Sequence, residues 1–260
     1  FQYRILVVTG MIWAADAIEV MILTFLLPIL SEEWDLQDGE DGTIGAVVFA
    51  GMLIGALFWP QISDRYGRRW AVILSNIGQI IFGMLSAAAW DMYSMMVLRF
   101  ITGFCLGAAS CSFTLYAEFA PKADRGKLLV FQQAFWSFGA FFNSLLAWLI
   151  LETLDWRWYL ILSSLPLCII VYLAWKCPES VQYLVTTGKK DEAERILQKA
   201  ARDNKSPNVP NPDELRLSSQ QIVHDKRGNP MEIFAPKYFS TTVTCFIIMC
   251  GVTFSYYGIS

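Results

Sequence analysis

Three ionisable side chains stand inside long apolar stretches of this 260-residue sequence. Asp16 and Glu19 lie three positions apart, one helical turn along the same face, and Arg99 lies in a later apolar stretch. A charge near the middle of a bilayer costs at least about 2.5 to 3.5 kcal/mol, so such groups pair, face a cavity or become neutral. An acid that alternates between a guanidinium partner and an apolar setting would gain and lose a proton. A fixed pair that only orients two helices is the alternative.

The elements that position these residues are long and apolar. Apolar residues make up 55% of the chain and charged residues 17%, and the charges collect in short segments. A helix needs about 20 apolar residues to cross a hydrocarbon core of about 30 Å. Six stretches are therefore expected to be membrane spans: Ile5–Leu30, Ile44–Ile62, Trp70–Ala89, Tyr93–Leu115, Leu128–Leu151 and Trp156–Trp175. A seventh begins near Phe239 and stops at Ser260, so we expect the native chain to continue.

Charged residues assign the two sides of the membrane. If the spans alternate in direction, residues 31–43 and the short connections near Asp91 and Glu152 lie on one side, with nine acids and a single base, Arg157. The basic turns 65–69 and 122–127 lie on the other side. Because Lys and Arg stay cytoplasmic during insertion, we predict a cytoplasmic amino end. The acidic loop then faces the exterior or the lumen of a vesicle.

A polar segment separates the sixth span from the seventh. Within it, residues 191–201 carry Ala193, Ile196, Leu197 and Ala200 at helical spacing, which predicts a short amphipathic helix on the cytoplasmic face of the bundle. A solvated linker helix is the alternative. Prolines 207, 210 and 212 predict a flexible middle, and His224 is expected to be a solvated loop residue. The expected parts are a six-helix bundle over 1–176, a cytoplasmic loop over 177–238 and the start of a seventh span over 239–260.

Small residues and cysteines have structural interpretations. Gly51 with Gly55, and Gly103 with Gly107, form GxxxG pairs that predict close helix packing. The six cysteines fall in or beside apolar spans without metal-ligand spacing, so we expect them to be small buried side chains. The sequence predicts no metal site and no cofactor.

Three strings of residues stand at or near the cytoplasmic ends of spans. Asp64-Arg-Tyr-Gly-Arg-Arg69 follows the second span, and its glycine permits a tight turn. The second string begins at Arg99 with glycines at 103 and 107, and continues with Tyr116-Ala-Glu118 and Arg125-Gly126. The third runs from Pro178-Glu-Ser to Gly188 after the sixth span.

In this order and spacing the strings resemble the signatures of the sugar-porter branch of the major facilitator superfamily. More narrowly, Thr114–Phe119, Asp155–Ser163 and Phe254–Gly258 are similar to segments of the synaptic-vesicle-two-related proteins, a branch of the organic-ion and sugar transporter relatives. The resemblance implies an all-α membrane fold of twelve helices around a central cavity. This chain would hold the amino-terminal six-helix half, the cytoplasmic loop and the start of helix seven.

The resemblance also implies roles for single residues. Proton-coupled sugar porters pair the acid matched here by Asp16 with the arginine matched by Arg99, so Asp16 is the first candidate for proton coupling and Glu19 its competitor. The relatives also hold their outward-facing state with a cytoplasmic gate. The residues that resemble this gate are Asp64, Arg65, Gly67, Arg68 and Arg69, together with a predicted pair of Glu118 and Arg125.

A substrate region is expected on the fifth span. Gln133 matches the glutamine with which sugar porters bind sugar, but Ala140 stands where those relatives keep another polar side chain. Aromatic residues surround the position instead, which favours an organic ion over a sugar. The predicted substrate-binding residues are Gln133, Arg99, Trp136 and Asn143.

The sequence therefore predicts a secondary active transporter that moves a small organic solute by alternating access, with a proton as the coupling ion. Its partners would be that solute, the proton and the lipid bilayer of a plasma, secretory or synaptic vesicle membrane. The alternative is a non-transporting vesicle scaffold or receptor, which has little use for buried charges. An enzyme is disfavoured because no Ser/His/Asp, Cys/His, metal or P-loop pattern is present. A pI of about 5.3 disfavours nucleic-acid binding.

Overall fold

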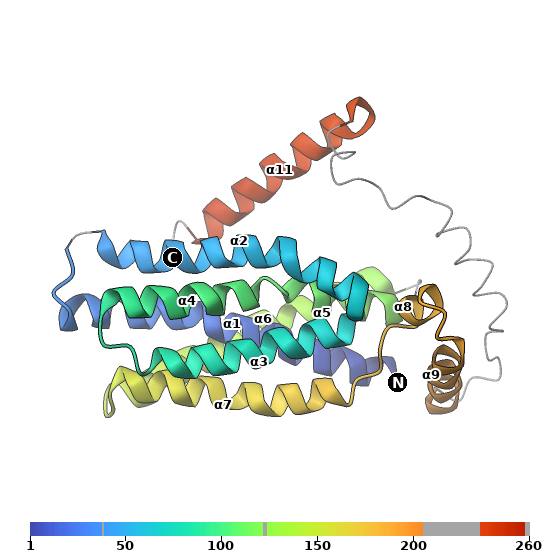
Figure 1. Cartoon of the computed structure of the whole chain (residues 1–260), viewed down its shortest axis with the longest axis horizontal. Helices are drawn as coiled ribbons and strands as arrows, with labels where there is room; N and C mark the ends of the chain where they lie inside the picture. Colours follow the sequence, from blue (N-terminus) through green and yellow to red (C-terminus); the bar gives the residue numbers. More distant parts are fainter. Residues whose placement is uncertain (38, 122–123, 205–234, 258–260) are drawn as a thin grey trace. The chain divides into compact units, whose positions relative to one another are not determined.

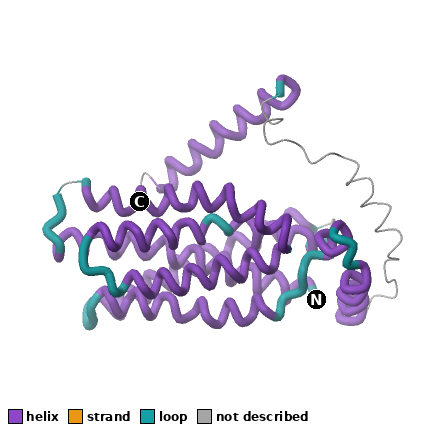
Figure 2. The backbone as a smooth tube through the Cα atoms, in the orientation of Figure 1, coloured by secondary structure: helices purple, strands orange, loops and turns teal. Residues whose placement is uncertain are grey.

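The computed structural model describes residues 1–37, 39–121, 124–204 and 235–257, and all regular structure within these ranges is helical (Figures 1 and 2). The chain divides into two compact units, Phe1–Pro210 and Asn211–Ser260, which are described separately below. The expectations for Lys122, for His224 and for the prolines at 207, 210 and 212 lie outside the described residues.

The first unit is a bundle of long helices that run side by side (Figure 1). Each predicted span corresponds to a helix or a helix pair, and the sixth span matches at both ends. The bundle helices are α1 (Gln2–Glu33), α2 (Glu40–Tyr66), α3 (Arg68–Ser86), α4 (Met92–Leu106), α5 (Ala109–Phe119), α6 (Arg125–Leu151) and α7 (Trp156–Trp175). The second unit contains α11 (Pro236–Tyr257), where the seventh span was predicted.

Six helical segments of the described residues are long and apolar enough to cross a membrane, namely α1, α2, α6, α7, α11 and the segment made of α4 and α5. The third predicted span corresponds to α3 (Arg68–Ser86), which is less apolar than these segments. Its 19 residues bury the polar side chains of Ser75, Asn76 and Gln79, which lower its hydropathy. The helix nevertheless packs within the bundle against α4 and α7.

The fourth predicted span is broken into two helices. α4 ends at Leu106 and α5 begins at Ala109, and a short non-helical segment separates them in Figure 2. A Cβ added to Gly107 would lie 2.4 Å from the carbonyl carbon of Gly55 on α2, so the two backbones touch here. Gly51 and Gly103 make a similar approach, since a Cβ on either would lie 2.2 Å from a backbone oxygen of the other helix. The predicted close packing of the glycine pairs is confirmed.

α1 is the most buried helix of the bundle. Within its most apolar window 72% of the residues are buried, against 33% for α2 and 22% for α6. It packs against α6, α7, α5 and α2, and Gly139 of α6 sits against the backbone of Ala14. Because α1 is enclosed on several sides, the two acids in its middle, Asp16 and Glu19, are buried among other helices.

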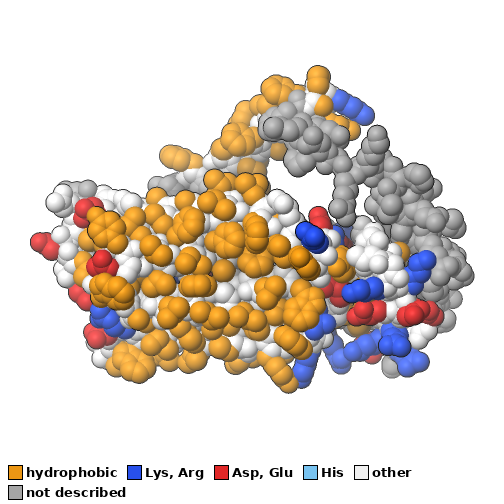
Figure 3. All heavy atoms as spheres, in the orientation of Figure 1, with side chains coloured by type: hydrophobic (Ala, Val, Ile, Leu, Met, Phe, Trp, Pro, Cys, Tyr) orange, Lys and Arg blue, Asp and Glu red, His pale blue; other side chains and the backbone are white. Residues whose placement is uncertain are grey.

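The outer surface of the bundle has the distribution expected of a membrane protein. Large apolar side chains such as Leu53, Leu57, Trp148 and Ile169 are exposed. In Figure 3 apolar side chains cover this face of the bundle, while charged side chains gather at its two ends, mostly acidic at one end and both basic and acidic at the other. The acidic end holds the α1–α2 loop, where Arg157, the single base predicted on this side, lies 3.6 Å from Glu33. At the same end Asp91 caps α4, and hydrogen bonds from Ser94 hold the pKa of Asp91 below its usual range.

Two short helices follow the bundle at its basic end (Figure 1). α8 (Val181–Thr186) is capped by the hydroxyl of Ser180, and α9 (Lys190–Asp203) follows. α9 is the predicted amphipathic helix, and it packs Ala193 and Ile196 against Tyr183 and Leu184 of α8.

The prediction for the cysteines is half right. Cys105, Cys111 and Cys177 are buried, whereas Cys168, Cys245 and Cys250 are exposed. The exposed three lie on α7 and α11, whose apolar outer surfaces suit a lipid environment.

Candidate functional site: buried charges within the bundle

An ion pair lies buried between α1 and α4. Arg99 Nη1 is 3.4 Å from Glu19 Oε2, and both residues are 1% exposed. Arg99 Nε and Nη2 have no hydrogen-bond partner among the described residues, so the guanidinium keeps unused donors. A buried pair of this kind is expensive to break, because the remaining charge is left without compensation.

In this structure Arg99 pairs with Glu19, the predicted competitor, and not with Asp16. Asp16 Oδ1 instead accepts a hydrogen bond of 2.9 Å from Gln79 Nε2 on α3. Its Oδ2 has no partner among the described residues. Glu19, the predicted competitor, holds the guanidinium, since one turn of α1 turns the two acids toward different neighbours.

The structure makes room for the Glu19 carboxylate on the α3 side. A Cβ added to Gly83 would lie 2.9 Å from Glu19 Oε1 and 3.1 Å from Ser164 Oγ of α7. A side chain at this position would therefore require the Glu19 carboxylate to shift. Gln79 and Gly83 lie one turn apart on α3, and the sequence analysis missed both, although a glutamine in an apolar span is a visible signal.

The predicted substrate residues of α6 face different ways. Gln133 is exposed, whereas the neighbouring Gln132 is fully buried and neither of its amide atoms has a partner among the described residues. Trp136 lies against Trp13 of α1, with ring centroids 5.6 Å apart. Asn143 is buried and accepts a hydrogen bond of 3.0 Å from the hydroxyl of Tyr159 on α7.

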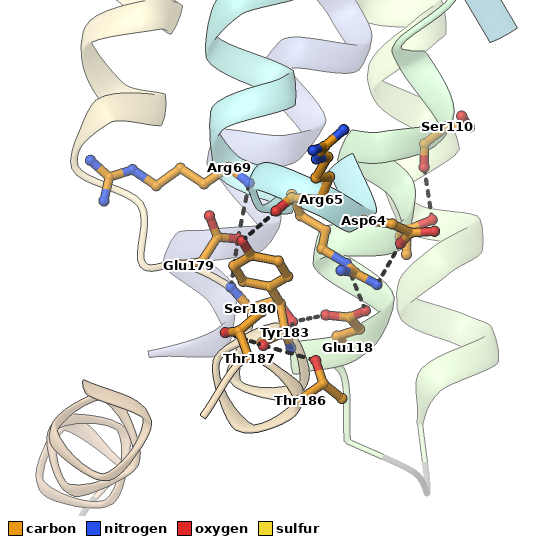
Figure 4. A network of polar contacts seen from close by, with 12 residues as sticks. Asp64, Arg65, Arg69, Ser110, Glu118, Glu179, Ser180, Tyr183, Thr186 and Thr187 are labelled. Atoms are coloured by element: carbon orange, nitrogen blue, oxygen red, sulfur yellow. Dashed lines mark hydrogen bonds and ion pairs between the residues drawn. The ribbon is translucent and has the colours of Figure 1, made fainter. Parts of the chain in front are cut away.

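A second polar network joins the basic ends of several helices (Figure 4). Arg68, at the start of α3, lies 3.0 Å from Asp64 of α2 and 3.4 Å from Glu118 of α5. The hydroxyl of Ser180 donates to the other oxygen of Glu118 and accepts from the backbone of Tyr183. One arginine therefore links α2 to α5, and Glu118 extends the link to α8.

Glu179 ties the segment before α8 to the turn between α2 and α3. Its Oε1 accepts from the backbone N–H of Arg69 at 3.1 Å and of Ser180 at 2.9 Å. Gly67 in that turn has a φ of +113°, and a Cβ there would lie 2.3 Å from Glu179 Oε2. The turn therefore needs glycine for its backbone conformation and for the approach of this carboxylate.

Several predicted gate contacts need correction. Glu118 does not pair with Arg125, which is exposed at the first residue of α6. Asp64 pairs with Arg68 as predicted, but Arg69 Nη2 donates to the backbone oxygen of Trp175 at 2.6 Å. The Arg65 guanidinium is exposed beside the ring of Tyr66. Glu179, Ser180 and Tyr183 belong to the network although only their motif, not their role, was identified from the sequence.

The described residues contain no group of three or more His, Cys, Asp or Glu side chains that could hold a metal ion. The buried polar groups include two acids, one guanidinium and several amides in an apolar bundle. Such a set can bind and release protons and form alternative ion pairs.

Residues 18–259 match the family described as "Sugar (and other) transporter". The chain belongs to this family. Among the relatives of this sugar transporter family member, the synaptic vesicle 2-related protein of Xenopus laevis is 39% identical over 100% of the chain and 46% of the relative. Organic cation/carnitine transporter 7 of Arabidopsis thaliana is 32% identical over 100% of the chain and 58% of the relative.

Solved structures show the same fold for this member of the family. The major facilitator superfamily proton:xylose symporter XylE, bound to 6-bromo-6-deoxy-D-glucose, matches with a TM-score of 0.76 over 90% of this chain and 56% of that chain, at 22% identity. The predicted fold and the resemblance to the major facilitator superfamily are confirmed. The chain spans about half the length of the relatives it matches. It is a multi-pass membrane protein, and its relatives are named as transporters or vesicle proteins, not as enzymes.

Proposed function

We propose that the whole protein is a secondary active transporter of a small organic ion, driven by a proton gradient. The observation that carries this proposal is the Glu19–Arg99 pair at 3.4 Å, with Asp16 one turn away on α1. Two acids and one guanidinium in a buried apolar setting form a set in which one acid can be neutral while the other is paired. A scaffold has little use for such a costly arrangement.

The proton step follows from the unequal partners of the two acids. Glu19 is neutralised by Arg99, while Asp16 accepts from a neutral amide and has a second oxygen without a partner. If a motion of α4 brings the unused donors of Arg99 to Asp16, Asp16 releases its proton and Glu19, which loses its partner, takes one up. Net transport requires that these two transfers open to opposite sides of the membrane. The coupling residues are thus Asp16, Glu19 and Arg99, with Gln79 holding Asp16 between steps.

An organic ion suits this chain better than a sugar. The Trp13–Trp136 pair supplies an aromatic surface beside the α1 acids, and Ala140 lacks the hydrogen-bonding group that a sugar hydroxyl needs. A relative is named as an organic cation/carnitine transporter. Aromatic faces attract organic cations. Gln133 and Asn143 remain candidates for contact with the solute.

The network around Arg68 is proposed as the cytoplasmic gate, and the amino end is proposed to be cytoplasmic because the basic end of the bundle carries α8, α9 and the α2–α3 turn. Ion pairs at a surface contribute only about 0 to 1 kcal/mol as fixed contacts. A gate acts instead through contacts that exist in one state and not in the other.

Flux measurements on the full-length protein in liposomes test the proposal. Radiolabelled tetraethylammonium, carnitine, benzoate and glucose would be offered with and without an inward proton gradient. We expect one of the organic ions to accumulate only with the gradient and to exchange without it. If no solute shows flux above that of protein-free liposomes, the scaffold function is favoured. If flux occurs but does not depend on pH, the proton is not the coupling ion.

A further inference from the structure

A groove of about 630 Å³ lies where α1 begins and α7 ends, at the basic end of the bundle. Its walls come from the first turns of α1, from the last turn of α7 with the residues after it, and from one side of α9. None of these residues belongs to the Glu19–Arg99 pair or to the network around Arg68. The groove therefore needs an explanation of its own.

Three exposed cations stand on the three walls: Arg4 on α1, Lys176 after α7 and Lys199 on α9. Among the described residues none of the three forms an ion pair. The ammonium of Lys176 lies 4.3 Å from the ring centre of Tyr172. Asp203, one turn beyond Lys199, is the one acid in the lining. The rim therefore attracts an anion.

The interior of the groove is apolar. Val7 and Val8 follow Arg4 by one turn, and Leu173 precedes Lys176 by one turn, so both helices place apolar side chains about 5 Å deeper than their cations. Cys177 forms part of the wall, and burial raises the pKa of its thiol to about 12, so this wall is uncharged. Polarity thus falls from the rim toward the membrane, as it does along a glycerophospholipid.

We propose that this groove binds one anionic glycerophospholipid of the cytoplasmic leaflet, with the headgroup phosphate at Arg4, Lys176 and Lys199 and the acyl chains against Val7, Val8 and Leu173. The cytoplasmic leaflet carries the anionic lipids of a cell membrane, and basic pockets between membrane helices suit their headgroups. A free phosphate would leave the apolar half of the groove unused. The bound lipid would contact α9 and the ends of the two spans α1 and α7 that form the other walls of the groove.

Native mass spectrometry of the full-length protein in detergent tests this assignment, with phosphatidylserine or phosphatidylcholine added. We expect one tightly retained phosphatidylserine, and at least about ten-fold weaker binding in a Lys176→Gln/Lys199→Gln variant, since each basic residue near the headgroup strengthens anionic lipid binding. A Lys127→Gln/Lys190→Gln variant removes two exposed cations outside the groove and should bind as the wild type does. Val7→Trp keeps the cations, fills the apolar half, and should weaken phosphatidylserine binding several-fold.

Several outcomes would overturn the proposal. The first is an equal loss of phosphatidylserine binding in the two double variants. The second is equal binding of phosphatidylserine and phosphatidylcholine by the wild type, and the third is unchanged binding by Val7→Trp. If millimolar glycerol phosphate displaces the lipid, the groove recognises only the phosphate group and is a simple anion site. An absence of retained lipid in the wild type would mean that another part of the full-length chain fills the groove. None of these readouts depends on transport.

Discussion

Arg99 of α4 lies 3.4 Å from Glu19 of α1, while Asp16, one turn earlier on the same helix, is bonded to Gln79 at 2.9 Å. Neutralising the two acids should therefore have different effects on stability. Removing the charge of Glu19 leaves a buried guanidinium without compensation, whereas removing the charge of Asp16 leaves the hydrogen bond from Gln79 in place. Substitutions at the two positions should separate stability from proton coupling.

The substitution Asp16→Asn should preserve folding and abolish gradient-driven accumulation, while exchange of labelled for unlabelled solute continues. Its amide oxygen can still accept from Gln79, but it cannot take up a proton. Liposome uptake with an imposed pH gradient and counterflow without one would measure the two activities. Wild-type accumulation by Asp16→Asn would show that Glu19 alone carries the proton or that both acids are structural.

The substitution Glu19→Gln should destabilise the protein by about 3 to 5 kcal/mol, because it breaks a buried pair from one side. The control is Arg157→Gln, which breaks the half-exposed pair with Glu33 and should cost about 0 to 1 kcal/mol. Thermal unfolding in detergent, followed by tryptophan fluorescence, would compare them. Similar melting temperatures for the two variants would show that the Glu19–Arg99 pair is less stabilising than its burial implies.

The turn between α2 and α3 should tolerate no side chain at Gly67. Gly67→Ala combines a strained φ of +113° with a Cβ 2.3 Å from Glu179 Oε2. Gly188→Ala is the matched control, since its φ is +81° but nothing lies within 4 Å of the added Cβ. The control should lose about 1 to 2 kcal/mol of stability from backbone strain, and Gly67→Ala clearly more. Equal losses would mean that Glu179 moves aside without cost.

Arg68→Gln should shift the protein toward the inward-open state, because Arg68 links Asp64 on α2 to Glu118 on α5. A cysteine introduced at the exposed Gln133 would report on access from the cytoplasmic side. Its rate of modification should rise several-fold in Arg68→Gln and remain unchanged in Arg125→Gln, whose exposed guanidinium lies outside the network. A similar rate of cysteine modification in both variants would show that Arg68 is not part of the gate.

Labelling with a membrane-impermeant maleimide in intact cells should show the orientation of the chain. A cysteine at Gln37, exposed in the acidic α1–α2 loop, should react from outside. A cysteine at Lys190, exposed at the start of α9, should react only after permeabilisation. The buried Cys177 should contribute no background. The reverse pattern would invert the proposed topology, and with it the cytoplasmic gate.

The sequence by itself determined the helices, the family and the residues worth testing. Long apolar runs and three ordered strings are local properties of the chain. The α7 boundaries, the close packing of the glycine pairs and the family match agree with them. Asp16, Glu19 and Arg99 were identifiable because charge in an apolar span is costly wherever the helices pack.

Only the tertiary structure decided which of these residues meet. Asp16 and Glu19 lie about 60° apart around one helix, so the rotation of α1 and the positions of Gln79 on α3 and Arg99 on α4 select the partner of each acid. Tertiary packing also decides that Glu118 pairs with Arg68 rather than with Arg125. The distance between Glu118 and Arg68 depends on how α3, α5 and α8 come together. The role of Gln79, the space at Gly83 and the groove beside α9 likewise arise between helices, where no pattern along a single helix can show them.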